Sequence, residues 1–190
     1  MTSLAVYRES GDLLSAPITD VDKIQSLLSE QGVLYERWVA SAPLDDTAEQ
    51  DEVLSAYADP IATLKASYDF QSIDVVAILP DNPNKSEFRQ KFLSEHTHKD
   101  FEMRFFVEGK GLFYLHIEDK VYVIMCEKGD LLSVPQDTAH WFDMGENPNF
   151  KCIRLFSTDG GWEADFTGSD IATRFISMDE YVEAHVKDIA

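Results

Sequence analysis

The feature that most constrains this chain is a succession of short, strand-like segments between residues 101 and 156. The segments are rich in Val, Ile, Phe and Tyr, and turn signals separate them at 108–111, 118–120, 127–130 and 145–148. Successive short strands joined by tight turns are typical of an antiparallel sandwich or barrel. The sequence therefore predicts an all-β core.

The segments on either side of this core have a mixed pattern that is partly helical. The elements expected there are helices over 20–31, over 48–58, from Pro60 onward and over 178–186, and strands over 33–38 and 73–79. The 190 residues contain no internal repeat and no linker, so we expect one domain. Its expected parts are a partly helical N-terminal shell over 1–94, a barrel core over 95–160, and a C-terminal strand and helix over 161–190.

The charge of the chain excludes several classes of partner. The sequence has 16 Lys and Arg against 35 Asp and Glu, a net charge of −19, which repels phosphate backbones and anionic lipid surfaces. We therefore expect neither nucleic-acid binding nor membrane binding. The longest apolar runs fall far short of the roughly 20 residues that a membrane helix needs. The two cysteines, Cys126 and Cys152, form no short-spaced pair, which favours a reducing, cytoplasmic location.

Two of the five histidines lie close together, at His96 and His98, and Glu102 follows four residues later. Side chains at positions i and i+2 of an extended segment share a face, so both imidazoles can converge on one point. Glu102 can add a carboxylate oxygen, and His140, which follows a strand and a proline turn, is the best candidate for a fourth ligand. This nitrogen and oxygen set suits Fe, Ni, Co or Mn, and the lack of thiolates argues against a structural zinc site. The alternative is that His96 and His98 are ordinary surface histidines.

The wider spacing resembles the two motifs of the cupin superfamily. Three residues separate His98 from Glu102 and six separate Glu102 from Gly109, as in the first motif. Five residues separate Gly129 from Pro135, and His140 follows, as in the second motif. The resemblance implies a double-stranded β-helix, a jelly-roll-like barrel, with the metal in its mouth and peripheral helices that are mostly N-terminal. The chain departs from the motifs at Gln90, Asp137 and Met144.

Two longer segments, 96–107 and 134–145, are similar to the signatures of the acireductone dioxygenase family of methionine salvage. The similarity is detailed over 92–162 and looser over nearly the whole chain. It implies a dioxygenase that cleaves acireductone, 1,2-dihydroxy-3-keto-5-(methylthio)pentene, with O2. The Fe(II) form is expected to yield 2-keto-4-methylthiobutyrate and formate. The Ni(II) form is expected to yield 3-methylthiopropionate, formate and carbon monoxide. The resemblance implies one ion per chain, on His96, His98, Glu102 and His140.

Strand alternation places Arg104 on the same face as Glu102, so Arg104 is expected to point into the cavity. A buried arginine needs an anion, and next to a cationic metal that anion is best explained as the negative oxygens of a substrate. The family resemblance implies that Arg104 helps to form and hold the acireductone dianion. Arg154 is a candidate for a second positive group, or else an ordinary strand residue.

An apolar pocket for the methylthio tail is expected from Phe92, Phe142 and Trp162. Phe142 shares strand parity with His140, but core aromatic residues are the alternative for all three. Glu95, directly before the histidine pair, is expected to support catalysis or metal loading, as the resemblance suggests, or else to be a plain surface carboxylate.

Other functions remain open on the sequence. Another metal-dependent cupin enzyme, such as a flavonol-type dioxygenase or a sugar-phosphate isomerase, would use the same ligands. A phosphate substrate needs a cluster of Lys and Arg, however, and only Arg104 and Arg154 are available. A non-catalytic cupin that binds a small molecule has no need of an open metal site. The expected partners are therefore acireductone and O2, and we expect a monomer.

Overall fold

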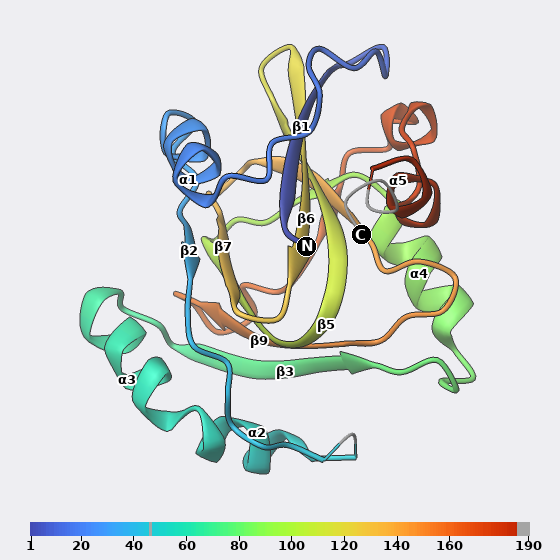
Figure 1. The fold of residues 1–190 in the computed structure, drawn as a ribbon. Coiled ribbons are helices and arrows are strands. Elements are labelled where there is room, and N and C mark those ends of the chain that lie inside the picture. Colours follow the sequence, from blue (N-terminus) through green and yellow to red (C-terminus); the bar gives the residue numbers. More distant parts are fainter. Residues whose placement is uncertain (46, 186–190) are drawn as a thin grey trace.

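The computed structural model describes residues 1–45 and 47–185. It shows a barrel of antiparallel strands with helices around it (Figure 1). The barrel consists of two sheets that share one long strand, β5 (Glu102–Ile117). The predicted all-β core with peripheral helices is confirmed.

The two sheets have different strand orders around β5. The first runs β1 (Ser3–Arg8), β6 (Lys120–Glu127), β5, β8 (Ala139–Asp143), β4 (His96–Thr97) and β10 (Asp165–Phe166). The second runs β2 (Tyr35–Arg37), β7 (Asp130–Val134), β5, β9 (Phe150–Phe156) and β3 (Ser72–Ile78). The segment expected to be a shell, 1–94, thus supplies β1, β2 and β3 to the barrel as well as helices.

β5 belongs to both sheets because it changes partners along its length. Its first half pairs with β7 and β9, and its second half pairs with β6 and β8. The register against β9 shifts between Phe106 and Glu108, which is a bulge of the kind that bends a strand. Gly109 follows with φ of +70°, and a Cβ there would overlap the backbone of Asn149, so this bend requires glycine.

Five α-helices and one 3-10 helix surround the barrel in the described part of the chain. They are α1 (Val21–Ser29), α2 (Gln50–Ala56), α3 (Ala58–Ser67), α4 (Lys85–Leu93), η1 (Ile171–Arg174) and α5 (Met178–His185). α2 and α3 pack Val53 and Leu64 against one sheet, and α5 packs Tyr181 against the other. Residue 186, where the last helix was expected to end, lies outside the described residues. No helix of the described chain is long and apolar enough to cross a membrane.

Candidate metal centre

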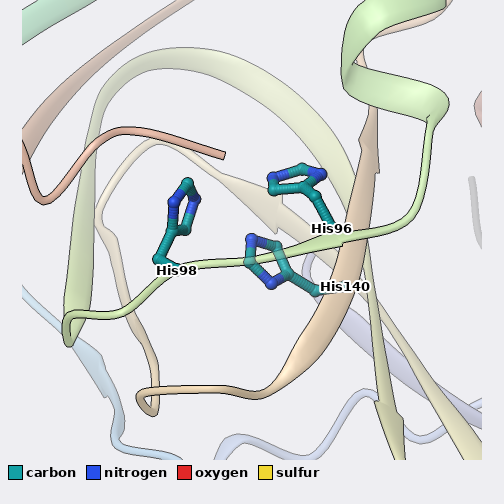
Figure 2. A group of neighbouring side chains, drawn as sticks. All are labelled: His96, His98 and His140. Carbon is teal, nitrogen blue, oxygen red and sulfur yellow. The ribbon is translucent and has the colours of Figure 1, made fainter. Parts of the chain in front are cut away.

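Three histidines from two separate segments meet inside the barrel. His96 on β4 and His140 on β8 are directly paired across the two strands, and His98 follows β4. Figure 2 shows the three rings facing one another. The ring centroids lie 4.3 Å apart for His96 and His140, and 5.1 Å apart for each pair that includes His98. One nitrogen from each ring lies within 4.8 Å of the others, and all three residues are buried.

Each histidine is oriented by a backbone carbonyl. The Nδ1 atoms of His96, His98 and His140 each lie 2.8 Å from the carbonyl oxygens of Ser94, Glu163 and Thr138, respectively. A carbonyl oxygen only accepts hydrogen bonds, so each Nδ1 carries the proton and each Nε2 keeps its lone pair. The tautomer that binds a metal through Nε2 is therefore already selected in all three rings.

Glu102, at the start of β5, faces the same point with one oxygen free. Its side chain is fully buried, and its Oε1 accepts a hydrogen bond of 2.6 Å from Arg104 Nε. Its Oε2 lies 3.4 Å from His98 Nε2 and 3.7 Å from His140 Nε2. Among the described residues, neither Glu102 Oε2 nor His140 Nε2 has a hydrogen-bond partner. Two orphaned acceptors in the same buried place indicate a missing positive ligand.

The protonation states agree with this interpretation. Burial lowers the pKa of His140 from 6.5 to about 3, and it also lowers the pKa of His96, so both rings are neutral near pH 7. Burial alone would raise the pKa of Glu102, but Arg104 and His98 hold it well below its ordinary value. The site thus offers three imidazole nitrogens and one carboxylate, which is a donor set for a divalent transition metal. Both cysteines are buried and free, and neither belongs to this group.

Arg104 lies beside the ligand group and is held between a carboxylate and two aromatic rings. It is only 4% exposed, and its guanidinium carbon lies 5.0 Å from the ring centroid of Phe113 and 5.4 Å from that of Phe142. Within the described chain, only Glu102 accepts a hydrogen bond from it, through Nε. The two terminal nitrogens therefore remain available for an anion.

Arg154 lies directly opposite Arg104 on the neighbouring strand β9. Two like charges at paired positions repel each other, and here each has its own carboxylate. Arg154 donates to both oxygens of Asp74, from Nε at 2.8 Å and from Nη2 at 2.6 Å, and Asp74 is its pair on β3. Arg154 thus lines the cavity with a carboxylate already bound to its Nε and Nη2 atoms.

A cavity of about 350 Å³ opens beside His96 and His98. Its wall combines apolar residues of β3 and α4 with three positively charged side chains, Lys91, Arg104 and Arg154. The wall includes Val76, Ile78, Phe92, Trp162, Arg104 and Arg154. Such a cavity, mostly apolar with a few convergent charges, is the usual form of a site for a small molecule.

The other predicted site residues are placed as follows. Phe92 and Trp162 line the cavity, and Trp162 is half exposed. Phe142 does not line it, because its ring lies in the core beneath Arg104 and is 1% exposed. Glu95 points away from the three imidazoles. Its oxygens bind His116 Nδ1 at 2.8 Å and Thr167 Oγ1 at 2.6 Å.

Sequence reasoning missed several residues of this site. Asp74 partners Arg154, Phe113 supports Arg104, and Phe88 and Phe166 line the cavity. Phe113 stands in β5 an odd number of residues from Arg104, so simple alternation excluded it from the same face; the bulge at 106–108 reverses that parity. Asp74 carries a usable signal, since it is a charged residue within an apolar strand run.

Comparisons with known proteins agree with this geometry. Residues 3–164 match the profile of the ARD/ARD′ family. The chain is 55% identical over 183 residues to acireductone dioxygenase of Methylococcus capsulatus, covering 96% of this chain and 98% of that relative. It is 56% identical over 182 residues to acireductone dioxygenase of Aquifex aeolicus, covering 96% and 99%.

A solved structure has the same fold. It is acireductone dioxygenase from Bacillus anthracis with a cadmium ion in its active centre, with a TM-score of 0.78 and 28% sequence identity. The match covers 87% of this chain and 98% of that one. The expected cupin barrel is thereby confirmed.

Proposed function

The chain belongs to the ARD/ARD′ family, and on this basis we propose that it is a metal-dependent acireductone dioxygenase that acts in methionine salvage. The relatives that carry this activity in their names match it over nearly its full length, at 55% and 56% identity. Its substrates are accordingly acireductone and O2.

We propose that His96, His98, Glu102 and His140 hold one Fe(II) or Ni(II) ion. The observation that carries this assignment is the pair of orphaned acceptors, Glu102 Oε2 and His140 Nε2, which face each other at 3.7 Å in a buried site. When bound, the ion would supply a Lewis acid and a template for the substrate oxygens. The three histidines would hold it through Nε2 lone pairs that the Nδ1 hydrogen bonds keep free of protons, and Glu102 would hold it through Oε2.

Arg104 is proposed to bind the negative oxygens of the enediol. Its terminal nitrogens have no acceptor among the described residues, and its charge favours loss of protons from the substrate. The aromatic rings below the guanidinium exclude water, so the charge of Arg104 acts in a medium of low dielectric constant. Arg154, already bound by Asp74, is proposed to add positive potential to the same wall.

The methylthio tail is proposed to lie along the apolar wall of the cavity. Phe92 and Trp162 stand in this wall beside Val76 and Ile78. Phe142 contributes from behind, because its ring meets that of Phe92 edge-on at 6.1 Å. Burying the tail there removes apolar surface from water and leaves the polar end of the substrate at Arg104.

Glu95 is proposed to support the metal site from outside. Its carboxylate and its carbonyl both bind Thr167, which ties β4 to β10 directly behind His96. We further propose a cytoplasmic monomer. The two free, buried thiols suit a reducing compartment, and light scattering on a size-exclusion column tests the oligomeric state.

The decisive experiment uses the purified protein, stripped and reloaded with Fe(II) or Ni(II). Acireductone is added under oxygen, and its consumption, formate and carbon monoxide are measured. We expect 2-keto-4-methylthiobutyrate and formate from the iron-loaded protein, and 3-methylthiopropionate, formate and carbon monoxide from the nickel-loaded protein. No consumption of acireductone by either form would remove the proposed function.

The Arg104→Ala variant tests the role of the arginine. We expect it to retain its metal and to lose kcat by about 10²–10³-fold, the usual cost of removing a group that stabilises developing negative charge. Arg104→Lys keeps the charge but not the planar fork, and its kcat is expected to lie between those of the wild type and the Arg104→Ala variant. Full turnover in the Arg104→Ala variant would reject the assignment.

A further inference from the structure

Gly111 lies inside strand β5, in a position where glycine needs an explanation. It pairs with Cys126 on β6, and its φ is not in the left-handed region that requires glycine. A glycine inside a strand weakens the strand, because it packs nothing and costs conformational entropy. The reason for Gly111 must therefore be space.

The space is occupied by the ring of Phe142. A Cβ built on Gly111 would overlap the Cζ and Cε2 atoms of that ring. Phe142 has little room to retreat, because it is 1% exposed and its ring centroid lies 4.8 Å from that of Phe113 and 5.3 Å from that of Phe150. Phe92 closes another side at 6.1 Å.

The Phe142 ring also supports a polar group, the guanidinium of Arg104. Phe142 and Phe113 carry the guanidinium at 5.4 Å and 5.0 Å, and the same guanidinium donates from Nε to Glu102 at 2.6 Å. A ring displaced from Gly111 can therefore move only against its aromatic neighbours or against Arg104. Movement toward Arg104, or against Phe113, whose ring also lies against the guanidinium, changes where the terminal nitrogens of Arg104 point.

We infer that Gly111 is a positioning residue for the reaction: the missing side chain at 111 lets the Phe142 ring lie beneath Arg104 and sets the direction of its guanidinium. The inference rests on the proposed function, in which Arg104 binds the anionic enediol. It concerns neither the metal ligands nor their partners, because the atoms nearest to the added Cβ all belong to Phe142.

The test is a double-mutant cycle on the full chain, with Gly111→Ala, Phe142→Leu and the double variant. We expect Gly111→Ala to retain one metal per chain and to lose kcat by about 10–100-fold, since a misplacement of about 1 Å can cost 10²-fold. In the Phe142→Leu background, where the shorter side chain leaves room, the same change is expected to cost less than about threefold. Phe106→Leu is the matched control, because Phe106 is buried in the same core cluster but does not support Arg104.

A second measurement reads the position of Arg104 without turnover. Under argon, the absorption spectrum of bound acireductone separates the singly from the doubly deprotonated enediol. We expect the wild type and the Phe106→Leu variant to bind the dianion, and Gly111→Ala to bind a larger share of the monoanion. A purely structural defect would lower Tm and metal content and leave this spectrum unchanged.

Several results would overturn the inference. One is a Gly111→Ala variant with full kcat and an unchanged spectrum. Another is a Gly111→Ala change that lowers kcat equally in the wild type and in the Phe142→Leu background. Gly111→Ala is also measured in the Phe106→Leu background. If Phe106→Leu reduces the kcat loss of Gly111→Ala as much as Phe142→Leu does, the effect is a general loosening of the core, and the inference is rejected. If Gly111→Ala does not fold, Phe142→Leu decides alone, because unchanged kcat without the ring would reject the role of Phe142. Inactivity of the wild type would instead reject the proposed function itself.

Discussion

Glu102 and Asp130 are two of the three carboxylates that are fully buried in the described part of the chain, the third being Asp143, and their surroundings are opposite in kind. Each stands at the first residue of a strand of the same sheet, β5 and β7. Asp130 accepts four hydrogen bonds at 2.7–2.9 Å, from Thr2 Oγ1, Tyr35 OH, Arg37 Nη1 and the backbone N–H of Glu127. Glu102 accepts one hydrogen bond, from Arg104, and its second oxygen faces two imidazoles that cannot donate to it.

The hydrogen-bond donors around a buried carboxylate distinguish a structural role from a ligand-binding role. Burying a carboxylate is costly, and donors on both of its oxygens offset this cost. Asp130 has these donors, and through them it links Thr2 and strand β2 to strand β7. Glu102 lacks them on one side, so the folded chain alone leaves the site incomplete. An incomplete polar network beside oriented histidines indicates a ligand.

The strongest test of the contrast is His98→Ala. We expect metal retention after dialysis against a chelator to fall by more than the 10–100-fold typical for losing an outer partner of a metal ligand, and turnover to fall with it. Metal at about 100 times its Kd stabilises a folded protein by roughly 2.7 kcal/mol, and this gain should disappear in the variant. Asp130→Asn is the control and should bind metal normally. Wild-type metal affinity in His98→Ala would contradict the ligand assignment.

The pH dependence of the metal-free protein provides the next test. Folded His140 has a pKa of about 3, against 6.5 ordinarily, so the unfolded chain binds its proton first as the pH falls. Stability is therefore complete above about pH 6.5 and is lost on the way to pH 3, by roughly 3 kcal/mol between pH 6.5 and 4. His96 acts with the same sign. Urea unfolding across this range measures the slope.

His140→Gln should flatten that curve, because glutamine takes up no proton. A slope as steep as that of the wild type would show that other groups dominate the acid limb. Bound metal should shift the loss of stability to lower pH, since protons compete with it for the same nitrogens.

Asp130→Asn tests the fully hydrogen-bonded carboxylate of the comparison. The amide cannot accept from all four donors, and we expect a loss of about 2 kcal/mol in the free energy of unfolding. This expected loss is smaller than the loss from breaking a fully buried ion pair, because the side chain of Arg37 is 38% exposed. Denaturant titration measures the loss, and metal content and kcat per folded chain should not change. A large fall in kcat would contradict the separation of the two regions.

Tyr35→Phe is expected to have the smallest effect. It removes one donor from Asp130 and leaves three, so the free energy of unfolding should fall by about 1 kcal/mol. A loss as large as that of Asp130→Asn would mean that the tyrosine, rather than the number of donors, maintains the network.

Much of the metal site was predictable because its pattern is local. His96, His98 and Glu102 lie within seven residues, and strand alternation already places the side chains of the first two on one face. His140 followed from its turn and from the resemblance to a known motif. The carbonyl of Glu163 that orients His98 was not predictable, because it belongs to a loop 65 residues away.

The substrate side was less predictable, for a related reason. Phe142 shares parity with His140 in β8, yet its ring lies in the core under Arg104 rather than in the cavity wall. The pairing of Asp74 with Arg154 depends on the register of β3 against β9. The strand β1 was missed because its pairing with β6 joins segments more than 100 residues apart.

The sequence by itself determined the class of this protein: an all-β core, a strongly negative net charge, and nitrogen and oxygen ligands at the spacing of a known metal motif. These properties depend on composition, on periodicity and on the spacing of residues that are close together along the chain. The tertiary structure decided which lone pairs stay free, which arginine keeps open donors, and why position 111 has no side chain. Those facts depend on contacts between distant segments, and the barrel alone brings such segments together.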